Sequence, residues 1–371
     1  MTDALIVGGG VIGLSLAYEL AGEGWKVRLL ERGYPGREAS WAGAGILPPA
    51  GAGSETDPYE QLLKLSNELH RVWSARLREE TGVDNGYRRC GGIYLARDAA
   101  AKTELDRTAD GWRRQGVTVE ALSQADLAAR ESALAGGAAS SNLRAAYFLP
   151  EETQLRNPRH LKALLVGCAL RGVEVHAGVP VEDFQIRGGR IERVLTGVGA
   201  FEAERVCLTS GPWTKTLLSR LGIHASLKPI RGQIALLNAP RPLLRSIVNE
   251  GPRYLVPRPE GRILVGSTEE DAGFEKCTTA AGIAGLLDFA LSLAPGLKGA
   301  QLEQCWAGLR PSTLDGRPYL GKIPGIDNGY VAAGHFRSGL QLSAGTAAVM
   351  SRLMRGLDPQ LDLTPFRVDR G

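Results

Sequence analysis

Long hydrophobic runs are missing from this chain. The uncharged stretch Ala4–Tyr18 is too short and too rich in glycine to span a bilayer, which takes about 20 apolar residues. Asp3 lies at the very start and no basic segment precedes the apolar stretch, so no signal peptide is expected. We therefore expect a cytoplasmic protein without a membrane partner.

Cysteine is also scarce. The five cysteines are widely spaced, odd in number and contain no Cys-x-x-Cys pair: Cys90, Cys168, Cys207, Cys277 and Cys305. This pattern argues against a disulfide framework and against a zinc site. We expect reduced core cysteines and no metal site.

A strong excess of one charge is absent as well. The chain has 44 Lys and Arg against 40 Asp and Glu, and its basic residues are scattered rather than clustered. A nucleic-acid partner is therefore not expected. The composition, with 43% hydrophobic and 23% charged residues, is that of an ordinary globular protein. At 371 residues the chain exceeds the ~250–300 residues of a single core, so two lobes are expected.

Glycine, by contrast, is abundant where it matters most. The apolar run Ala4–Val7 predicts a buried strand and leads directly into the glycine segment Gly8–Gly13. Leu14–Ala21 predicts a helix, and Trp25–Leu30 predicts a second strand that ends at Glu31. A G-x-G-x-x-G between a strand and a helix is typical of dinucleotide-binding folds.

Each glycine of that pattern has a physical task. Gly8 permits the tight turn, Gly10 lets the backbone approach a pyrophosphate, and Gly13 lets the helix pack closely on the sheet. The pyrophosphate would face the helix N-terminus. Glu31 follows at close to the expected ~20 residues, and a carboxylate there favours FAD or NAD over NADP. The alternative is a plain loop followed by a surface acid.

The segment 36–49 consists largely of small residues without a regular period. It is a poor helix or strand, and it suits a backbone that lies against a flat ligand. A flexible linker is the alternative. Its apolar residues Trp41, Ile46 and Leu47 favour an anchored loop.

Hydrophobic periodicity predicts the remaining elements. Helices are expected over Tyr59–Thr81, Ala99–Gln115, Leu122–Glu131, Arg159–Arg171, Thr279–Ala294 and 340–354. Strands are expected over Tyr87–Ala96, 173–175, Arg190–Leu195, Val206–Thr209, Ile230–Leu237, Arg253–Val256, Arg262–Gly266, Gln304–Arg310 and 329–334. The residues Ala133–Asn142 are expected to form a surface loop.

Several of these stretches together resemble the D-amino-acid oxidase superfamily of FAD amine oxidases, and most closely its glycine oxidases of the thiamine pathway. The resemblance spans nearly the whole chain. Its most specific parts are Gly308-Leu309-Arg310-Pro311 and Gly334-His335-Phe336-Arg337-x-Gly339. The others are Gly8–Gly13, Glu31, 36–47, 254–258, 261–268, Asp315-Gly316-Arg317-Pro318 and the continuation to Gln341.

The resemblance implies an α/β, two-lobed fold with FAD as cofactor. A Rossmann-like FAD-binding domain, discontinuous in sequence, would comprise residues 1–85, 151–220 and 320–371. An antiparallel-sheet substrate-binding domain would comprise residues 86–150 and 221–319. The resemblance further suggests a homotetramer.

It also implies a site. Arg310 would bind the substrate carboxylate with help from Tyr254, and Arg337 would serve either the substrate or the flavin. The expected FAD contacts are Gly8, Gly10, Val11, Ile12, Gly13, Glu31, Arg32, Ala39, Ser40, Ala44, Gly45, Ile46, Val181, Gly211, His335, Phe336, Arg337, Ser338, Gly339, Leu340 and Gln341. Related sarcosine oxidases attach FAD to a cysteine near the Arg310-Pro311 position. This chain has none there, and Cys305 falls several residues early, so non-covalent FAD is expected.

The implied activity is oxidative deamination of glycine, sarcosine or small D-amino acids. Hydride would pass from Cα to flavin N5 without a protein base, and O2 would reoxidise the flavin to give H2O2. Two alternatives remain open. One is a D-amino-acid or glycine dehydrogenase that passes electrons to a quinone. The other is an FAD-binding subunit of a larger amine oxidase.

Overall fold

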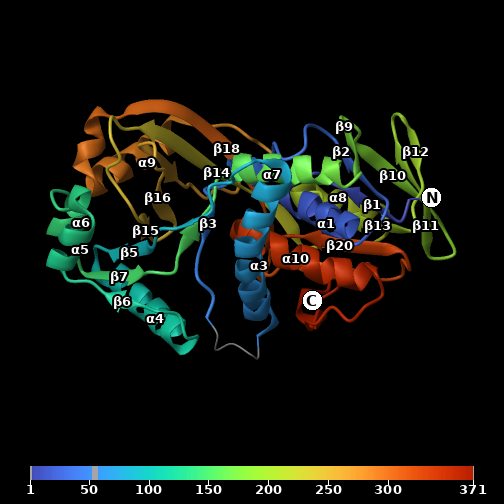
Figure 1. Ribbon diagram of the computed structural model, residues 1–371, viewed down its shortest axis with the longest axis horizontal. Helices are drawn as coiled ribbons and strands as arrows, with labels where there is room; N and C mark the ends of the chain where they lie inside the picture. Colours follow the sequence, from blue (N-terminus) through green and yellow to red (C-terminus); the bar gives the residue numbers. More distant parts are fainter. Residues whose placement is uncertain (1, 52–56, 371) are drawn as a thin grey trace.

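The computed structural model describes residues 2–51 and 57–370 and has two lobes (Figure 1). One lobe contains both described ends of the chain, at the right of the view, and the other lies to the left. The long strand β18 (Gln301–Thr313) and its neighbour β14 (Leu227–Asn238) reach the middle of the molecule.

The first lobe is built on a six-stranded sheet in the order β19-β20-β13-β1-β2-β9. The central strand β1 (Ala4–Val7) is completely buried and pairs in parallel with β2 (Val27–Glu31) and with β13 (Arg205–Leu208). The outer strands are β20 (Gly329–Ala333), β19 (Tyr319–Lys322) and β9 (Glu174–Ala177). Continuous apolar runs such as Ala-Leu-Ile-Val suit a parallel sheet that is covered on both faces.

Helices from three parts of the chain pack in this lobe. They are α1 (Val11–Gly22), α3 (Pro58–Thr81), α7 (Asn157–Leu170) and α10 (Gly339–Met354). Small residues permit their close approach: a Cβ on Gly167 would lie 2.8 Å from the Tyr18 ring. The periodicities that predicted these four helices are confirmed.

The second lobe contains an eight-stranded sheet in the order β18-β14-β17-β16-β15-β5-β7-β6. Its other members are β17 (Arg262–Gly266), β16 (Arg253–Pro257), β15 (Ile247–Glu250), β5 (Gly92–Ala96), β7 (Ala145–Leu149) and β6 (Glu120–Ala121). Most neighbours are antiparallel, but β15 and β5 are parallel. The helices of this lobe are α9 (Ala280–Leu293), α4 (Ala99–Arg114), α5 (Gln124–Arg130) and α6 (Ala138–Ser141).

Two small sheets complete the fold. One is formed by β10 (Val181–Arg187), β11 (Arg190–Thr196) and β12 (Gly199–Phe201). The other is formed by β3 (Ile46–Leu47), β8 (Thr153–Gln154) and β4 (Arg88–Arg89). The short helix α8 (Thr214–Arg220) follows β13.

Three predictions of local structure are wrong. The strand expected over Tyr87–Ala96 is broken into β4 and β5, because Gly91 adopts φ +71° and its N–H donates to the Glu152 carbonyl. The loop expected over Ala133–Asn142 contains α6, and its Ala139 is buried because Gly137 lets the segment approach α9 closely.

The segment 36–49 also has more structure than its composition indicated. It contains the short helix α2 (Ala39–Ala42) as well as β3. The buried Arg258 holds this segment in place, since its guanidinium donates to the Ala44 carbonyl at 2.8 Å and to the Leu155 carbonyl at 3.2 Å. A linker is therefore excluded.

All five cysteines are free thiols. Cys168 and Cys207 are buried as expected, but Cys90, Cys277 and Cys305 are only partly buried, so the expectation of five core cysteines is wrong. Over residues 2–51 and 57–370, no helix combines the length and the apolar character needed to cross a bilayer.

Candidate active site

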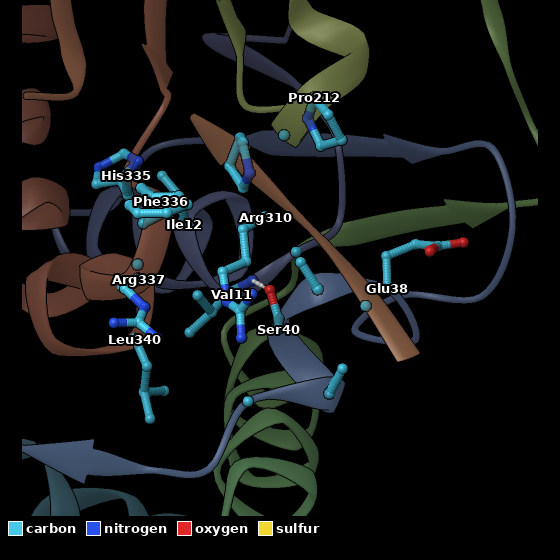
Figure 2. A pocket seen from close by; sticks show the side chains of 18 of the residues that line it. Val11, Ile12, Glu38, Ser40, Pro212, Arg310, His335, Phe336, Arg337 and Leu340 are labelled. Carbon is cyan, nitrogen blue, oxygen red and sulfur yellow. Dashed lines mark hydrogen bonds between the residues drawn. The ribbon is translucent and has the colours of Figure 1, made fainter. Parts of the chain in front are cut away.

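A cavity of about 510 Å³ lies where the two sheets meet. It is lined by β1, the turn into α1, α2, the start of α10 and strands of the eight-stranded sheet. Of the residues expected at the cofactor or substrate, all but Gly13 line it. Figure 2 shows Val11, Ser40 and Arg310 near the centre of the view, with Ile12, His335, Phe336, Arg337 and Leu340 on one side and Glu38 on the other.

The glycines of the first turn have distinct surroundings. Gly8 adopts φ +116°, and a Cβ there would lie 2.6 Å from the Thr209 carbonyl oxygen. A Cβ on Gly13 would lie 1.9 Å from the Gly8 carbonyl oxygen, so Gly13 packs the helix against the turn rather than lining the cavity. A Cβ on Gly10 would meet only the Ser40 hydroxyl, at 3.2 Å. Gly10 thus leaves room on the cavity side for a bulky ligand.

Glu31 and Ser40 brace this turn. Glu31 accepts hydrogen bonds from the N–H of Gly9 at 2.7 Å and of Gly33 at 2.9 Å. The Ser40 hydroxyl accepts from the Val11 N–H at 2.9 Å (Figure 2). Glu31 still lines the cavity, and a carboxylate has lone pairs to spare for ribose hydroxyls.

Two helix N-termini meet the cavity. The N-cap of α1 is Gly10 and that of α10 is Ser338, and neither helix has a side-chain cap or an acid in its first turn. Their N-terminal positive ends favour anionic ligand groups. Before α10, Phe336 adopts φ +46°, a strained conformation for a non-glycine residue that holds its backbone against the cavity.

A stacked pair of Arg32 and Trp213 lines another part of the cavity. The Arg32 guanidinium lies 3.4 Å from the Trp213 ring centroid and 3.3 Å from a Glu38 oxygen. Val181 and Gly211 also line the cavity. A flat base can pack against such apolar and cationic groups.

Asn157 provides a test of whether a polar cofactor fits. It is 1% exposed and lines the cavity, its Nδ2 donates to the Ser40 carbonyl at 2.8 Å, and its Oδ1 has no hydrogen-bond partner among the described residues. An orphaned buried acceptor is costly unless a ligand donor pairs with it. Hydroxyl or imide N–H groups of FAD supply such a donor, so the residues present fit this cofactor.

Arg310 lies on β18 with its side chain over Gly232. A Cβ on Gly232 would lie 2.2 Å from the Arg310 guanidinium, so only glycine leaves room for it. The guanidinium donates to the Ser267 hydroxyl at 2.6 Å and to the Thr268 carbonyl at 3.2 Å. Burial lowers the pKa of Arg310. Because an arginine remains charged, this burial leaves a poorly solvated cation that an anionic ligand stabilises.

Tyr254 and Arg337 flank Arg310. The Tyr254 ring occupies the space above Gly266, where a Cβ would lie 2.5 Å from it. Arg337 donates to the Pro252 carbonyl at 3.0 Å and lies 3.5 Å from a Glu269 oxygen. Arg337 is therefore already engaged at the cavity wall.

His335 is buried at the same wall. Its Nε2 lies 3.1 Å from the Thr346 hydroxyl, and burial lowers its pKa to about 3. It is therefore neutral at physiological pH and carries no charge to the site.

Several lining residues were missed from the sequence: Tyr94, Asn157, Trp213, Gly232 and Asn249. One signal was available: glycine within a strand often marks a close approach, which applies to Gly232 on β14. Tyr94 and Asn249 gave no local signal, because they reach the cavity only through strand pairing.

Over residues 3–353 the chain matches the DAO family, described as FAD dependent oxidoreductase. The chain belongs to this family, and it is an FAD-dependent oxidoreductase. The predicted family, the two-lobed α/β fold and the FAD cofactor are confirmed.

The similar proteins include several glycine oxidases. The chain is 35% identical to the glycine oxidase of Geobacillus kaustophilus over 370 residues, which cover 99% of this chain and 97% of that protein. It is 33% identical to the glycine oxidase of Pseudomonas putida over 365 residues, 98% and 97% of the two chains. The crystal structure of the Geobacillus kaustophilus enzyme superposes with a TM-score of 0.94 at 34% identity, covering 100% and 98%.

Proposed function

We propose that this chain oxidatively deaminates glycine and other small amines or amino acids, such as sarcosine and small D-amino acids, and returns the electrons to O2 as H2O2. The observation that carries the proposal is the half-buried Arg310 guanidinium in the same cavity as the dinucleotide cradle. The similarity of the chain to glycine oxidases over nearly its whole length supports the choice of substrate.

Different residues of the cavity would bind the substrate and stabilise the flavin. Arg310 forms a charge-assisted, bidentate pair with the substrate carboxylate, and Tyr254 donates a further hydrogen bond to it. Bound FAD supplies the hydride acceptor. The N-terminus of α10, with Gly339 and Leu340, stabilises negative charge at the flavin edge. Arg337 serves either the flavin or the substrate.

We further propose that FAD is held without a covalent bond. No cysteine lines the cavity within residues 2–51 and 57–370. Cys305 lies on β18 but packs against the core of the second lobe, on the face opposite to Trp306 and Arg310. Acid denaturation should release the yellow cofactor, and flavin that remains on the chain would contradict this.

The remaining proposals concern the whole molecule. The six-stranded sheet and its helices form the FAD-binding domain, from residues 1–85, 151–220 and 320–371, of which 1, 52–56 and 371 lie outside the described residues. Residues 86–150 and 221–319 form the substrate-binding domain. We propose that the protein is a cytoplasmic homotetramer. Sedimentation of the FAD-loaded protein tests its oligomeric state directly.

Peroxide release tests the activity. Purified, FAD-loaded protein is mixed in air with glycine, sarcosine, D-alanine or D-proline. Peroxide from glycine at a rate near that of the best substrate supports the proposal. Peroxide from the other amines alone would keep the oxidase activity but show that the substrate is not glycine. Flavin bleaching without peroxide indicates a dehydrogenase, and no bleaching with any amine indicates a non-catalytic FAD-binding subunit.

A further inference from the structure

The floor of the substrate end of the cavity is a row of residues across the eight-stranded sheet. Tyr94 on β5 pairs with Asn249 on β15, which pairs with Tyr254 on β16. Paired residues project from the same face with neighbouring Cβ atoms roughly 5 Å apart. All three line the cavity together with Arg310. The row of polar side chains that line the cavity therefore extends from Tyr254 on β16 across the next two strands, β15 and β5.

A buried carboxyl group organises this row. Glu152 is 0% exposed, accepts a hydrogen bond from the Tyr94 hydroxyl at 2.7 Å, and lies 3.5 Å from the Asn249 Nδ2. A Cβ on Gly92, two residues before Tyr94 on the same face, would lie 2.3 Å from the carboxyl carbon of Glu152. Glycine at position 92 is what allows the carboxyl group to lie beside the row.

This arrangement decides which atoms remain available to a ligand. An ionised carboxylate only accepts hydrogen bonds, so it takes the O–H of Tyr94 and an N–H of Asn249. The phenol oxygen of Tyr94 and the amide Oδ1 of Asn249 are then left as acceptors, and the second N–H of Asn249 is left as a donor. An edge contact between Tyr94 and Trp112, with ring centroids 4.7 Å apart, holds the phenol ring.

We propose that Tyr94 and Asn249, positioned by Glu152, form a second subsite that selects amino-acid substrates bearing an O–H or N–H donor beyond Cα or on the amine nitrogen. The inference rests on the proposed function, in which Arg310 holds the substrate carboxylate. Glycine occupies the Arg310 end alone, whereas a larger substrate reaches this row. A pocket wall that presents two hydrogen-bond acceptors discriminates strongly against analogues that lack the donor, because these acceptors are then left unpaired.

Pairs of isosteric substrates test the subsite. D-Serine is compared with D-2-aminobutyrate, and N-(2-hydroxyethyl)glycine with N-propylglycine, by kcat/KM at about pH 8.5, where Glu152 is ionised. In each pair a hydroxyl replaces a methyl group. We expect at least one pair to favour the hydroxyl by roughly tenfold or more. Equal or better turnover of the methyl compound in both pairs would overturn the proposal.

Variants then locate the effect. For each variant we take the ratio of kcat/KM for the hydroxyl substrate to that for the methyl substrate, so that general effects on turnover cancel. This ratio should fall to within about twofold of unity in Asn249→Leu and fall substantially in Tyr94→Phe. Glu152→Gln should also lower it, since the amide N–H would occupy one of the two acceptors. The matched control is Tyr147→Phe: Tyr147 is next in the row, but its hydroxyl donates to Asp106 away from the cavity. A ratio that persists in Asn249→Leu, or falls equally in Tyr147→Phe, would contradict the subsite.

A binding measurement keeps this proposal separate from the proposed activity. 3-Hydroxypropanoate and butanoate differ in the same way and have no amine to oxidise. Their dissociation constants are read from the shift of the flavin absorption spectrum. Tighter binding of the hydroxy acid, lost in Asn249→Leu, supports the subsite even if no amine is turned over, and equal binding of the two acids counts against it.

Discussion

The Nε2 atom of His70 on α3 lies 2.9 Å from the carbonyl oxygen of Gln341 and 2.9 Å from that of Leu340, in the first turn of α10. Because both partners are acceptors, the ring carries its proton on Nε2. The Ser66 hydroxyl enters the same turn: it donates to the Gln341 carbonyl and accepts from the Gly345 N–H at 2.9 Å. One face of α3 therefore holds the start of the helix that meets the cavity.

This contact predicts an effect of His70 on cofactor affinity. Burial lowers the pKa of His70 to about 4, so it acts as a neutral donor. His70→Leu removes one of the donors to two carbonyls, which keep the Ser66 and Ser343 hydroxyls. At a cost of about 1 kcal/mol, it should raise the dissociation constant of FAD by roughly fivefold. His70→Gln, which retains a donor, should keep most of the affinity. Fluorescence titration of apoprotein with FAD measures both, and equal losses in the two variants would refute a hydrogen-bonding role.

The glycine turn predicts a contrast between two alanine substitutions. At Gly13 the new Cβ would overlap the Gly8 carbonyl, whereas at Gly10 it would point into the cavity beside Ser40. Gly13→Ala should therefore destabilise the apoprotein by several kcal/mol, about the range of overpacking and strain. Gly10→Ala should leave the apoprotein melting temperature nearly unchanged and abolish tight FAD binding. Calorimetry without cofactor, followed by flavin absorbance after loading, separates the two effects.

Replacing Arg310 should affect substrate binding more than cofactor binding. Arg310→Met removes the cation but retains much of the apolar stem, and we expect kcat/KM for glycine to fall by roughly 10²-fold or more, since a buried charge-assisted pair is worth about 2–5 kcal/mol. Most of the change should appear in KM, with flavin content retained. Steady-state peroxide assays provide the test. Unchanged kinetics would show that Arg310 does not hold the carboxylate.

Glu152 predicts a pH-dependent stability. Burial raises its pKa to about 7 from an ordinary value of 4.5. Between these values the unfolded chain has released the proton that the folded chain still holds. The free energy of unfolding therefore falls as pH rises through this window, by up to about 3 kcal/mol.

Glu152→Gln cannot titrate, so its melting temperature should improve relative to the parent as the pH rises from 5 to 8. Glu151→Gln is the matched control, because Glu151 is an exposed neighbour paired with Arg89. Melting curves at several pH values give the comparison. A constant offset between Glu152→Gln and the parent would show that this carboxyl group does not titrate as expected.

The local sequence pattern was sufficient to predict the structure where the interacting residues are close in sequence. The strand, glycine turn and helix of residues 4–22 form one contiguous unit, and their apolar runs and glycine spacing predict it directly. The same holds for the long helix α3, which ends at Gly82 in a left-handed conformation. Resemblance added Arg310 and the segment 334–341, whose roles no local period reveals.

The sequence by itself thus determined the dinucleotide-binding turn, most helices and the family, because these depend on contacts between near neighbours and on a distinctive order of motifs. Only the tertiary structure decided which side chains line the cavity beside Arg310. Tyr94 and Asn249 are 155 residues apart, yet the parallel pairing of β5 with β15 makes them adjacent. That register depends on the packing of the whole second lobe, and a one-residue slip of either strand would turn its side chain away from the cavity.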